Sequence, residues 1–172
     1  MACDITLGRL EGCKDSVGGL NAIYFVNFGD AEGWTATDET ITGIAAGTPP
    51  SAFKYDLRGN SSFDQSLTSS RENGSTFAEQ TLTVSLKKQD AVTNKEVKML
   101  AYGRPHIIIE DNNGGLWVMG EDYGSEMTAT ASTGAAMGDK NGYELTFVAS
   151  ERGLAKHMTV DIDTVFAPVV GV

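Results

Sequence analysis

The sequence predicts an all-β fold with one short helix, in which two antiparallel sheets pack together as a β-sandwich or barrel. Apolar and polar residues alternate in several short segments of the 172-residue chain, as half-buried strands require. Turn-forming residues, among them 20 glycines, separate these segments. Only residues 94–101 have the spacing of a helix. This length suits a single β-rich domain, residues 1–172, which can bury a core without disulfides or metal.

The N-terminal part is expected to hold an extension followed by three strands. Residues 1–19 contain scattered glycines and form an extension or first loop. Residues 22–28 are a nearly continuous apolar run, which favours a buried strand. Residues 34–44 are threonine-rich and predict a weaker strand, and residues 53–57 alternate as a half-buried strand does.

A long hairpin is expected in the middle of the chain. Residues 63–70 and 77–87 flank Asn73-Gly74, a dipeptide typical of tight hairpin turns. The apolar face of the second strand predicts core residues, namely Ala78, Leu82, Val84 and Leu86. The polar face of the hairpin consists of Asp64, Ser66, Thr68, Glu79, Thr81 and Thr83.

The helix is expected to follow this hairpin. Thr93 and Glu96 fit a capping box, in which Thr93 is the N-cap, and Gly103 and Pro105 end the helix. Further strands are predicted in the C-terminal half, at residues 106–110, 116–119, 127–132 and 143–149.

The end of the chain leaves two readings open. Residues 165–172 are uncharged and mostly apolar. They form either a last strand in the chain's own core or a tail that docks on a neighbouring subunit. The glycine-rich N-terminal segment is a second candidate for such docking.

Charge and composition exclude several classes of function. The chain has 13 Lys and Arg against 23 Asp and Glu, a net charge of −10, and lacks the basic excess that non-specific nucleic-acid binding needs. Its N-terminus has no signal-peptide pattern, and no apolar run approaches the roughly 20 residues of a membrane span. Two cysteines, Cys3 and Cys13, suggest a reduced protein synthesised in the cytoplasm, with their pairing left open.

No motif predicts catalysis, a cofactor or a metal. Asp161 and Asp163 match a short phosphoryl-transfer pattern, but that chemistry needs a large α/β domain after the motif. Only seven residues follow Val165, so a solvated polar strand or loop is expected. His106 and His157 have no local ligand spacing. We therefore expect a protein that is not an enzyme.

Four segments resemble virion structural proteins of tailed bacteriophages, especially phages of Bacteroidetes-type hosts. They are CDITLGRLE (3–11), CKDSVGGL (13–20), AYGRPH (101–106) and STGAAMGD (132–139). Within that class, the order of elements resembles a tail tube protein. The resemblance implies hexameric rings that stack into a tube for DNA ejection, with a long hairpin in the inner wall.

From the alternation of the hairpin, we infer that its polar face lines this lumen, with the residues Asp64, Ser66, Thr68, Glu79, Thr81 and Thr83. The expected partners are further copies of the chain and other tail or neck proteins. DNA would pass without specific binding, and no membrane is involved. The expected location is the virion tail.

Two other functions remain as alternatives. A capsid decoration or head–tail connector protein shares the setting and the fold but forms trimers or a single ring. A non-catalytic β-sandwich binding module, for example one that binds carbohydrate, would expose clustered aromatic residues. Trp34 and Trp117 do not alternate with Lys or Arg, and the core is their expected place.

Overall fold

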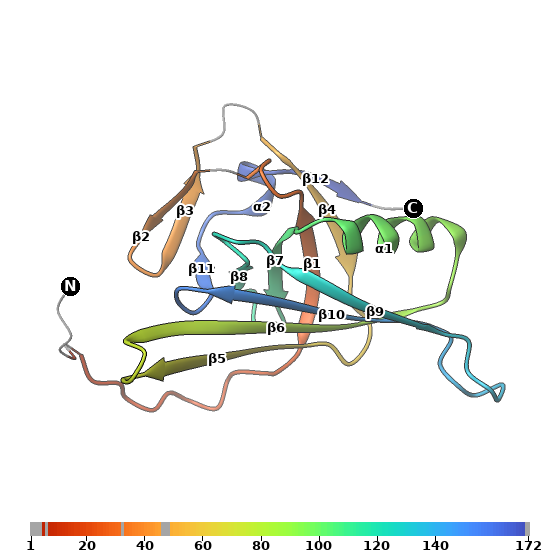
Figure 1. The fold of residues 1–172 in the computed structure, drawn as a ribbon, viewed down its shortest axis with the longest axis horizontal. Coiled ribbons are helices and arrows are strands. Elements are labelled where there is room, and N and C mark those ends of the chain that lie inside the picture. Colours follow the sequence, from red (N-terminus) through yellow and green to blue (C-terminus); the bar gives the residue numbers. More distant parts are fainter. Residues whose placement is uncertain (1–4, 6, 32, 46–48, 171–172) are drawn as a thin grey trace.

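The computed structural model describes residues 5, 7–31, 33–45 and 49–170, which form two sheets and two helices (Figure 1). The larger sheet has eight strands in the order β12-β4-β1-β7-β8-β11-β3-β2. Its strands are β1 Leu20–Val26, β2 Trp34–Thr37, β3 Thr40–Ile44, β4 Ser51–Asp56, β7 His106–Asp111, β8 Leu116–Met119, β11 Lys156–Met158 and β12 Ala167–Val170.

The smaller sheet has four strands in the order β5-β6-β10-β9 and is antiparallel throughout. Its strands are β5 Ser62–Ser70, β6 Ser75–Lys87, β9 Glu126–Ser132 and β10 Gly142–Glu151. The helices are α1 Ala91–Tyr102 and α2 Ile162–Val165. The mostly-β fold class is therefore confirmed, and the central hairpin is β5 and β6.

Two details of the predicted architecture are corrected. The eight-stranded sheet is mixed, because β11 pairs with β3 and β12 pairs with β4 in parallel. The polar strand or loop expected around Asp161 and Asp163 is the single-turn helix α2, in which Asp161 is the N-cap. The Phe166 N–H donates to the Ile162 carbonyl across this turn.

The single strand expected over residues 34–44 is the hairpin of β2 and β3. Thr37 pairs with Thr40, so the chain reverses at Asp38 and Glu39. Asp38 has a φ of 53°, a left-handed conformation that aspartate tolerates better than most residues. The sequence did not predict this turn, because residues 37–40 contain neither glycine nor proline.

The N-cap of helix α1 lies three residues before the predicted one. Its N-cap is Asp90, whose carboxylate accepts from the Thr93 N–H at 2.7 Å and from Thr93 Oγ1 at 2.9 Å. Thr93 therefore lies inside the helix and donates to the cap. Asp90 takes this role because an aspartate with extended backbone satisfies the free amides of the first turn. At the other end, Gly103 is the C-cap, so the helix ends where it was predicted to end, and the Gly103 N–H donates to the Met99 carbonyl.

The core consists of two clusters on opposite faces of the eight-stranded sheet. Ile107 and Ile109 face the cluster between the two sheets, and Ile108 faces the second cluster. Of the predicted core residues, Leu82 and Val84 are fully buried in the cluster between the sheets, and Leu86 is partly buried against it. Ala78 is also fully buried but belongs to neither cluster.

The C-terminal residues complete the eight-stranded sheet. Phe166 is buried in the second cluster, and β12 pairs with β4 along its length. This supports the interpretation of the C-terminal residues as a last strand in the chain's own core, while residues 171–172 lie outside the described part.

At the other end of the chain, residues 7–19 form no strand or helix before β1 begins. Cys13 is exposed, and Cys3 lies outside the described residues.

Candidate functional site

One face of the four-stranded sheet is exposed and polar, and it contains all six residues predicted for the hairpin wall. Strand register places Asp64 opposite Thr81 and Ser66 opposite Glu79. Directly paired residues of antiparallel strands point to the same side of a sheet. Thr68 and Thr83 belong to this side by alternation. We call this side the outer face.

Strands β9 and β10 extend the outer face beyond the hairpin, which the sequence interpretation did not anticipate. Glu144 lies opposite Ser85 on β6 and opposite Thr130 on β9. Two neighbouring pairs on β10 and β9 continue it, Thr146 with Thr128 and Val148 with Glu126. The sequence contains a pattern that predicts this extension, because Glu144 and Thr146 alternate with the buried Tyr143, Leu145 and Phe147.

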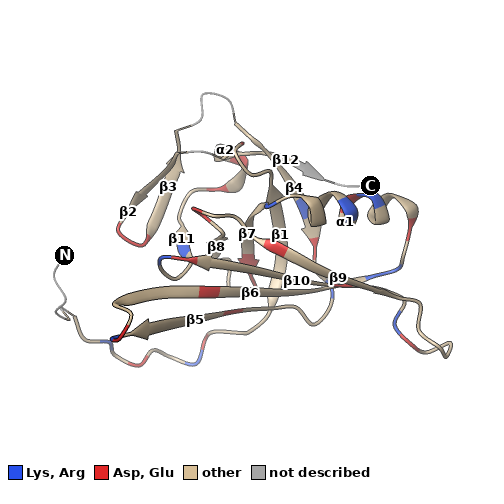
Figure 2. Cartoon of the chain, in the orientation of Figure 1, with Lys and Arg blue, Asp and Glu red and all other residues tan. Residues whose placement is uncertain are grey.

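The outer face is acidic and rich in hydroxyl groups. Its carboxylates are Asp64, Glu79, Glu126 and Glu144. Figure 2 shows acidic residues on the strands of this sheet and the basic residues of this region at its ends. Lys87, the last residue of β6, lies at the end of the face and lines the groove beside α1, and Lys140 in the β9–β10 loop pairs with Glu144 at 3.0 Å.

Neither edge strand of this sheet pairs with a further strand in the part of the chain that the structure describes, although α1 packs beside β9. The edge strands β5 and β9 pair on one side only, with β6 and β10. Natural proteins commonly protect free edges with lysine, proline or a bulge. The sequences SFDQSLTSS and EMTATAS contain no lysine or proline, and their registers with β6 and β10 show no bulge. These edges are therefore suited to pairing with another chain.

A groove lies between β4, the end of β6 and the start of α1, with a volume of about 630 Å³. A second cavity of about 420 Å³ continues it toward the end of α1, since Phe53, Tyr55 and Glu96 line both. Burial raises the pKa of the Tyr55 hydroxyl, and nearby Glu96 raises it further. The lining combines cations from separate segments, namely Lys54, Arg58, Lys87 and Lys88, with the carboxylates of Asp56, Asp90 and Glu96. No local sequence pattern could have predicted this grouping.

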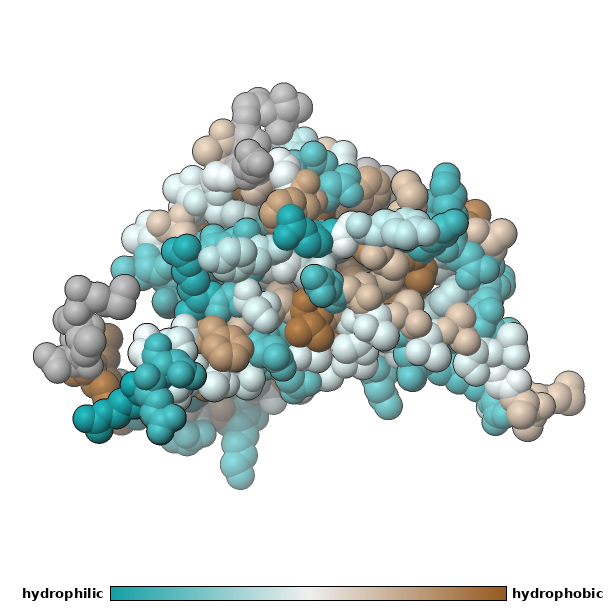
Figure 3. All heavy atoms as spheres, in the orientation of Figure 1, coloured by the Kyte–Doolittle hydropathy of each residue, from teal (hydrophilic) through white to brown (hydrophobic). Residues whose placement is uncertain are grey.

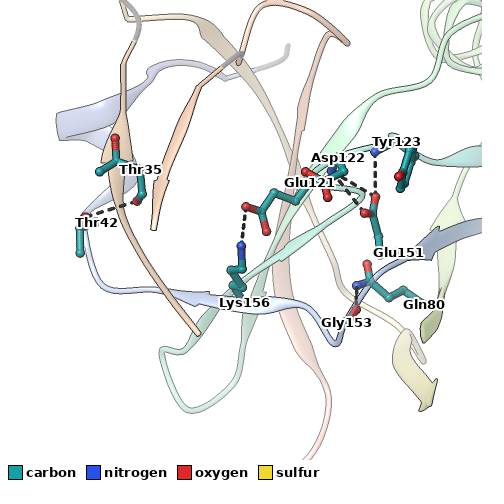
Figure 4. Close-up of polar contacts among 9 residues, drawn as sticks. All are labelled: Thr35, Thr42, Gln80, Glu121, Asp122, Tyr123, Glu151, Gly153 and Lys156. Carbon is teal, nitrogen blue, oxygen red and sulfur yellow. Dashed lines mark hydrogen bonds and ion pairs between the residues drawn. The ribbon is translucent and has the colours of Figure 1, made fainter. Parts of the chain in front are cut away.

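A loop at residues 120–125 ties the two sheets together (Figure 4). Glu151 of β10 accepts from the Asp122 N–H at 3.2 Å and the Tyr123 N–H at 3.0 Å. Gln80 of β6 accepts from the Gly120 N–H at 3.1 Å and donates to the Gly153 carbonyl at 3.3 Å. Burial raises the pKa of the Glu151 carboxyl, against the lowering effect of the two amide groups. These polar contacts fix the packing of one sheet on the other.

His106 connects the larger sheet to the 120–125 loop, at the junction of the two sheets. It is buried on β7, and its Nδ1 lies within hydrogen-bond distance of the Gly120 carbonyl. The ring stacks on Phe28 and meets the edge of Trp34. Burial lowers the pKa of the imidazole, so the neutral ring is favoured. His106 therefore acts in packing.

The residues considered for catalysis are not brought together. Asp161 and Asp163 lie at α2, His106 lies in the junction, and His157 meets the edge of the Trp117 ring. Across the described ranges, no group of three or more His, Cys, Asp or Glu side chains is placed to hold a metal ion. The helices of this part of the chain are too short or too polar to cross a membrane.

Trp34 and Trp117 do not form an aromatic platform. Trp34 packs against the second core cluster, while Trp117 packs against the first and donates to Asp111 at 3.2 Å.

Comparison with protein families, curated proteins and solved structures finds no match to this chain.

Proposed function

We propose that this chain is a structural subunit of a tailed-phage virion that forms hexameric rings. Stacked rings make a tail tube, and the outer face of the four-stranded sheet lines its lumen. The observation that carries this proposal is the outer face itself, a broad exposed surface with four carboxylates and many hydroxyl groups. Because the residues considered for catalysis lie apart in the described part of the chain, such a surface suits passive contact with solvent or with a passing polymer.

The physical reason concerns how DNA interacts with charge. DNA is retained on a protein when Lys and Arg displace the counterions of its phosphates. Asp64, Glu79, Glu126 and Glu144 do the opposite, because they repel phosphates at short range. Hydrated hydroxyl groups fill the space between them. A lumen with this lining lets DNA slide without trapping it.

The free edges explain how a ring closes. When β5 of one copy pairs with β9 of the next, the four-stranded sheets continue from subunit to subunit. The two edges are different surfaces, so the contact is head-to-tail and closes when the rotation per subunit fits a full turn. Closure also removes every exposed edge of the sheet. Further partners would be other tail or neck proteins of the same virion, assembled after synthesis in the host cytoplasm.

The test is the assembly state of the purified full chain, measured by light scattering after size exclusion and by electron microscopy. We expect hexameric rings and stacked tubes. Stable trimers would contradict the proposal and favour a decoration protein, and single rings that never stack would favour a connector. A monomer at all concentrations that quenches tryptophan fluorescence on adding sugars would favour a binding module.

A further inference from the structure

The sequence contains three Asn-Gly dipeptides, and the fold places them in different surroundings. They are Asn73-Gly74 in the β5–β6 turn, Asn113-Gly114 in the β7–β8 turn and Asn141-Gly142 at the start of β10. Asparagine is a chemically labile residue, because the backbone nitrogen that follows it can attack its side-chain amide. This attack occurs within one chain, so its rate depends on whether the two reacting groups can reach each other.

Both reacting groups are free in the β5–β6 turn, where Asn73 and Gly74 are exposed. The Asn73 N–H donates to Ser70 Oγ at 3.3 Å. Among the described residues, neither the Asn73 side-chain amide nor the Gly74 N–H has a hydrogen-bond partner. Gly74 has a φ of 61°, and no atom lies within 4 Å of the position that a Cβ would take there. Nothing in the turn therefore shields the Gly74 nitrogen.

The turn also lies far from the packed parts of the molecule. It is at the end of the hairpin opposite to α1 (Figure 1). Figure 3 shows that hydrophilic side chains gather in this part of the surface, in the lower left of the view. Loop tips of this kind move more than the strands that they connect, and this motion helps the two groups to meet.

Asn113 is held by hydrogen bonds at both reacting groups. Its Oδ1 accepts from the Val17 N–H at 2.9 Å, and its Nδ2 donates to the Val17 carbonyl at 2.8 Å. The Gly114 N–H donates to the Asp111 carbonyl at 3.1 Å. Attack of the Gly114 nitrogen on Asn113 would break these bonds, so the fold protects this site.

Asn141 is protected by the strand that follows it. Gly142 is buried and lies between β6 and β9, opposite Lys87 and Ser132. A Cβ at this glycine would lie 2.0 Å from the Leu86 carbonyl oxygen, so the backbone here is tightly packed. The Gly142 nitrogen would have to leave the sheet before it could turn toward the Asn141 side chain.

We propose that the β5–β6 turn is a site of spontaneous deamidation, at which Asn73 is converted to aspartate and isoaspartate while Asn113 and Asn141 are retained. The modification needs only water, and it does not depend on the proposed assembly. What selects the site is the contrast between one free Asn-Gly turn and two that the fold holds in place.

The reaction balances without an oxidant, a reductant or a cofactor. Hydroxide removes the proton of the Gly74 N–H, and the nitrogen attacks Asn73 Cγ. The new C–N bond closes a succinimide ring, and the Cγ–Nδ2 bond breaks as Nδ2 leaves as ammonia with a proton from water. A water molecule then adds to either ring carbonyl and opens the ring. The net reaction consumes one water and releases one ammonia.

The product changes both the charge and the length of the turn. It places a carboxylate beside Glu72 and adds one negative charge to a chain whose net charge is −10. In isoaspartate, the side-chain methylene becomes part of the main chain. The turn is then longer between Ser70 and Ser75, the last pair of the β5–β6 register. The charge at this end of the outer face therefore changes with the age of the protein.

The test is peptide mapping by mass spectrometry after the purified full chain is incubated at mildly alkaline pH in heavy-oxygen water. Cleavage after Arg71 and Lys87 gives residues 72–87, in which Asn73 is the only asparagine. We expect this peptide to gain heavy oxygen, and to become a substrate of an isoaspartate-specific methyltransferase, at least about tenfold faster than the Asn113 and Asn141 peptides. A tenfold ratio corresponds to about 1.4 kcal/mol in the activation free energy.

Two controls separate the effect of the fold from that of the dipeptide. In guanidinium the chain is unfolded, all three dipeptides are free, and their rates are expected to converge. Asn73→Gln keeps the amide but requires a larger ring, so the acidic species seen on ion exchange of the folded wild-type chain should form at least about tenfold more slowly. Equal rates at the three sites of the folded chain would overturn the inference, and so would an equal amount of the acidic species from Asn73→Gln.

Discussion

The two sheets of this protein differ in how many of their faces are buried. In the eight-stranded sheet, Ile107, Ile108 and Ile109 on β7 are all fully buried, although they point alternately to opposite sides. In the four-stranded sheet, β5 is exposed along most of its length, and β6 buries only one side. One sheet is therefore a core element, and the other presents a surface that the fold itself does not use. This difference places stability on both faces of the first sheet and on the inner face of the second, and it leaves the outer face of the second sheet for interaction.

The largest expected effect on stability distinguishes two adjacent residues on β6, one on each face of the four-stranded sheet. Leu82 is fully buried between the sheets, and Thr81 lies on the outer face. Leu82→Ala is expected to lower the free energy of unfolding by about 2–5 kcal/mol, because it removes buried surface and leaves a cavity. Thr81→Ala is expected to change it by less than about 0.5 kcal/mol. Urea unfolding measures both, and similar losses would show that the outer face is packed.

The second test concerns His106 at the junction of the sheets. Burial lowers the pKa of its imidazole, so the folded state binds fewer protons than the unfolded state below pH 6.5. The stability contributed by neutral His106 is present above this pH and is lost as pH falls below it. The slope is at most about 1.4 kcal/mol per pH unit. His106→Gln is expected to lack this component in urea unfolding between pH 7 and pH 5, and an unchanged slope would contradict the role of burial.

The third test concerns the start of α1. Hydrogen bonds from the Thr93 N–H and hydroxyl lower the pKa of the Asp90 carboxyl. The stability from this cap is therefore present at neutral pH and is lost as pH falls through the acidic range. Asp90→Ala is expected to lower the thermal midpoint at pH 7 and to speed amide exchange in the first turn. Asp90→Asn, which retains an acceptor, should lose less, and equal losses would argue against the side-chain cap.

The smallest expected change in stability is on the outer face. Asp64→Lys and Glu79→Lys are each expected to shift the free energy of unfolding by less than about 0.5 kcal/mol, because both side chains are exposed. In assembled particles the same changes should slow DNA release, since lysine displaces phosphate counterions. Thr37→Lys on β2 is the control for added charge elsewhere. Unfolding of either outer-face variant would contradict the orientation of the hairpin.

Local patterns predicted the faces of the hairpin well. A period of two along residues 77–87 is enough to assign Leu82 to the core and Thr81 to the surface, because strand geometry is local. The predicted helix start was wrong, because the cap is Asp90 and not Thr93. Both residue types are good caps, and only the bonds formed in the structure distinguish them. Local sequence patterns therefore predict which side chains are buried when a strand buries only one of its faces.

Long-range features could not be read from the sequence. Strand β11 has three residues, too few for alternation, and its parallel pairing with β3 joins distant segments. The α1–β4 groove likewise combines Lys54, Arg58 and Lys88 from separate segments. Its grouping depends on tertiary packing, which no short pattern encodes.

The position of the outer face in an assembled tube tests the central proposal most directly. A cryo-electron microscopy reconstruction of tubes formed by the purified chain would locate both sheets. We expect the four-stranded sheet to form a continuous inner wall, with Asp64, Glu79, Glu126 and Glu144 facing the lumen. A tube in which these carboxylates face the outside solvent, or an assembly without a lumen, would contradict the proposal.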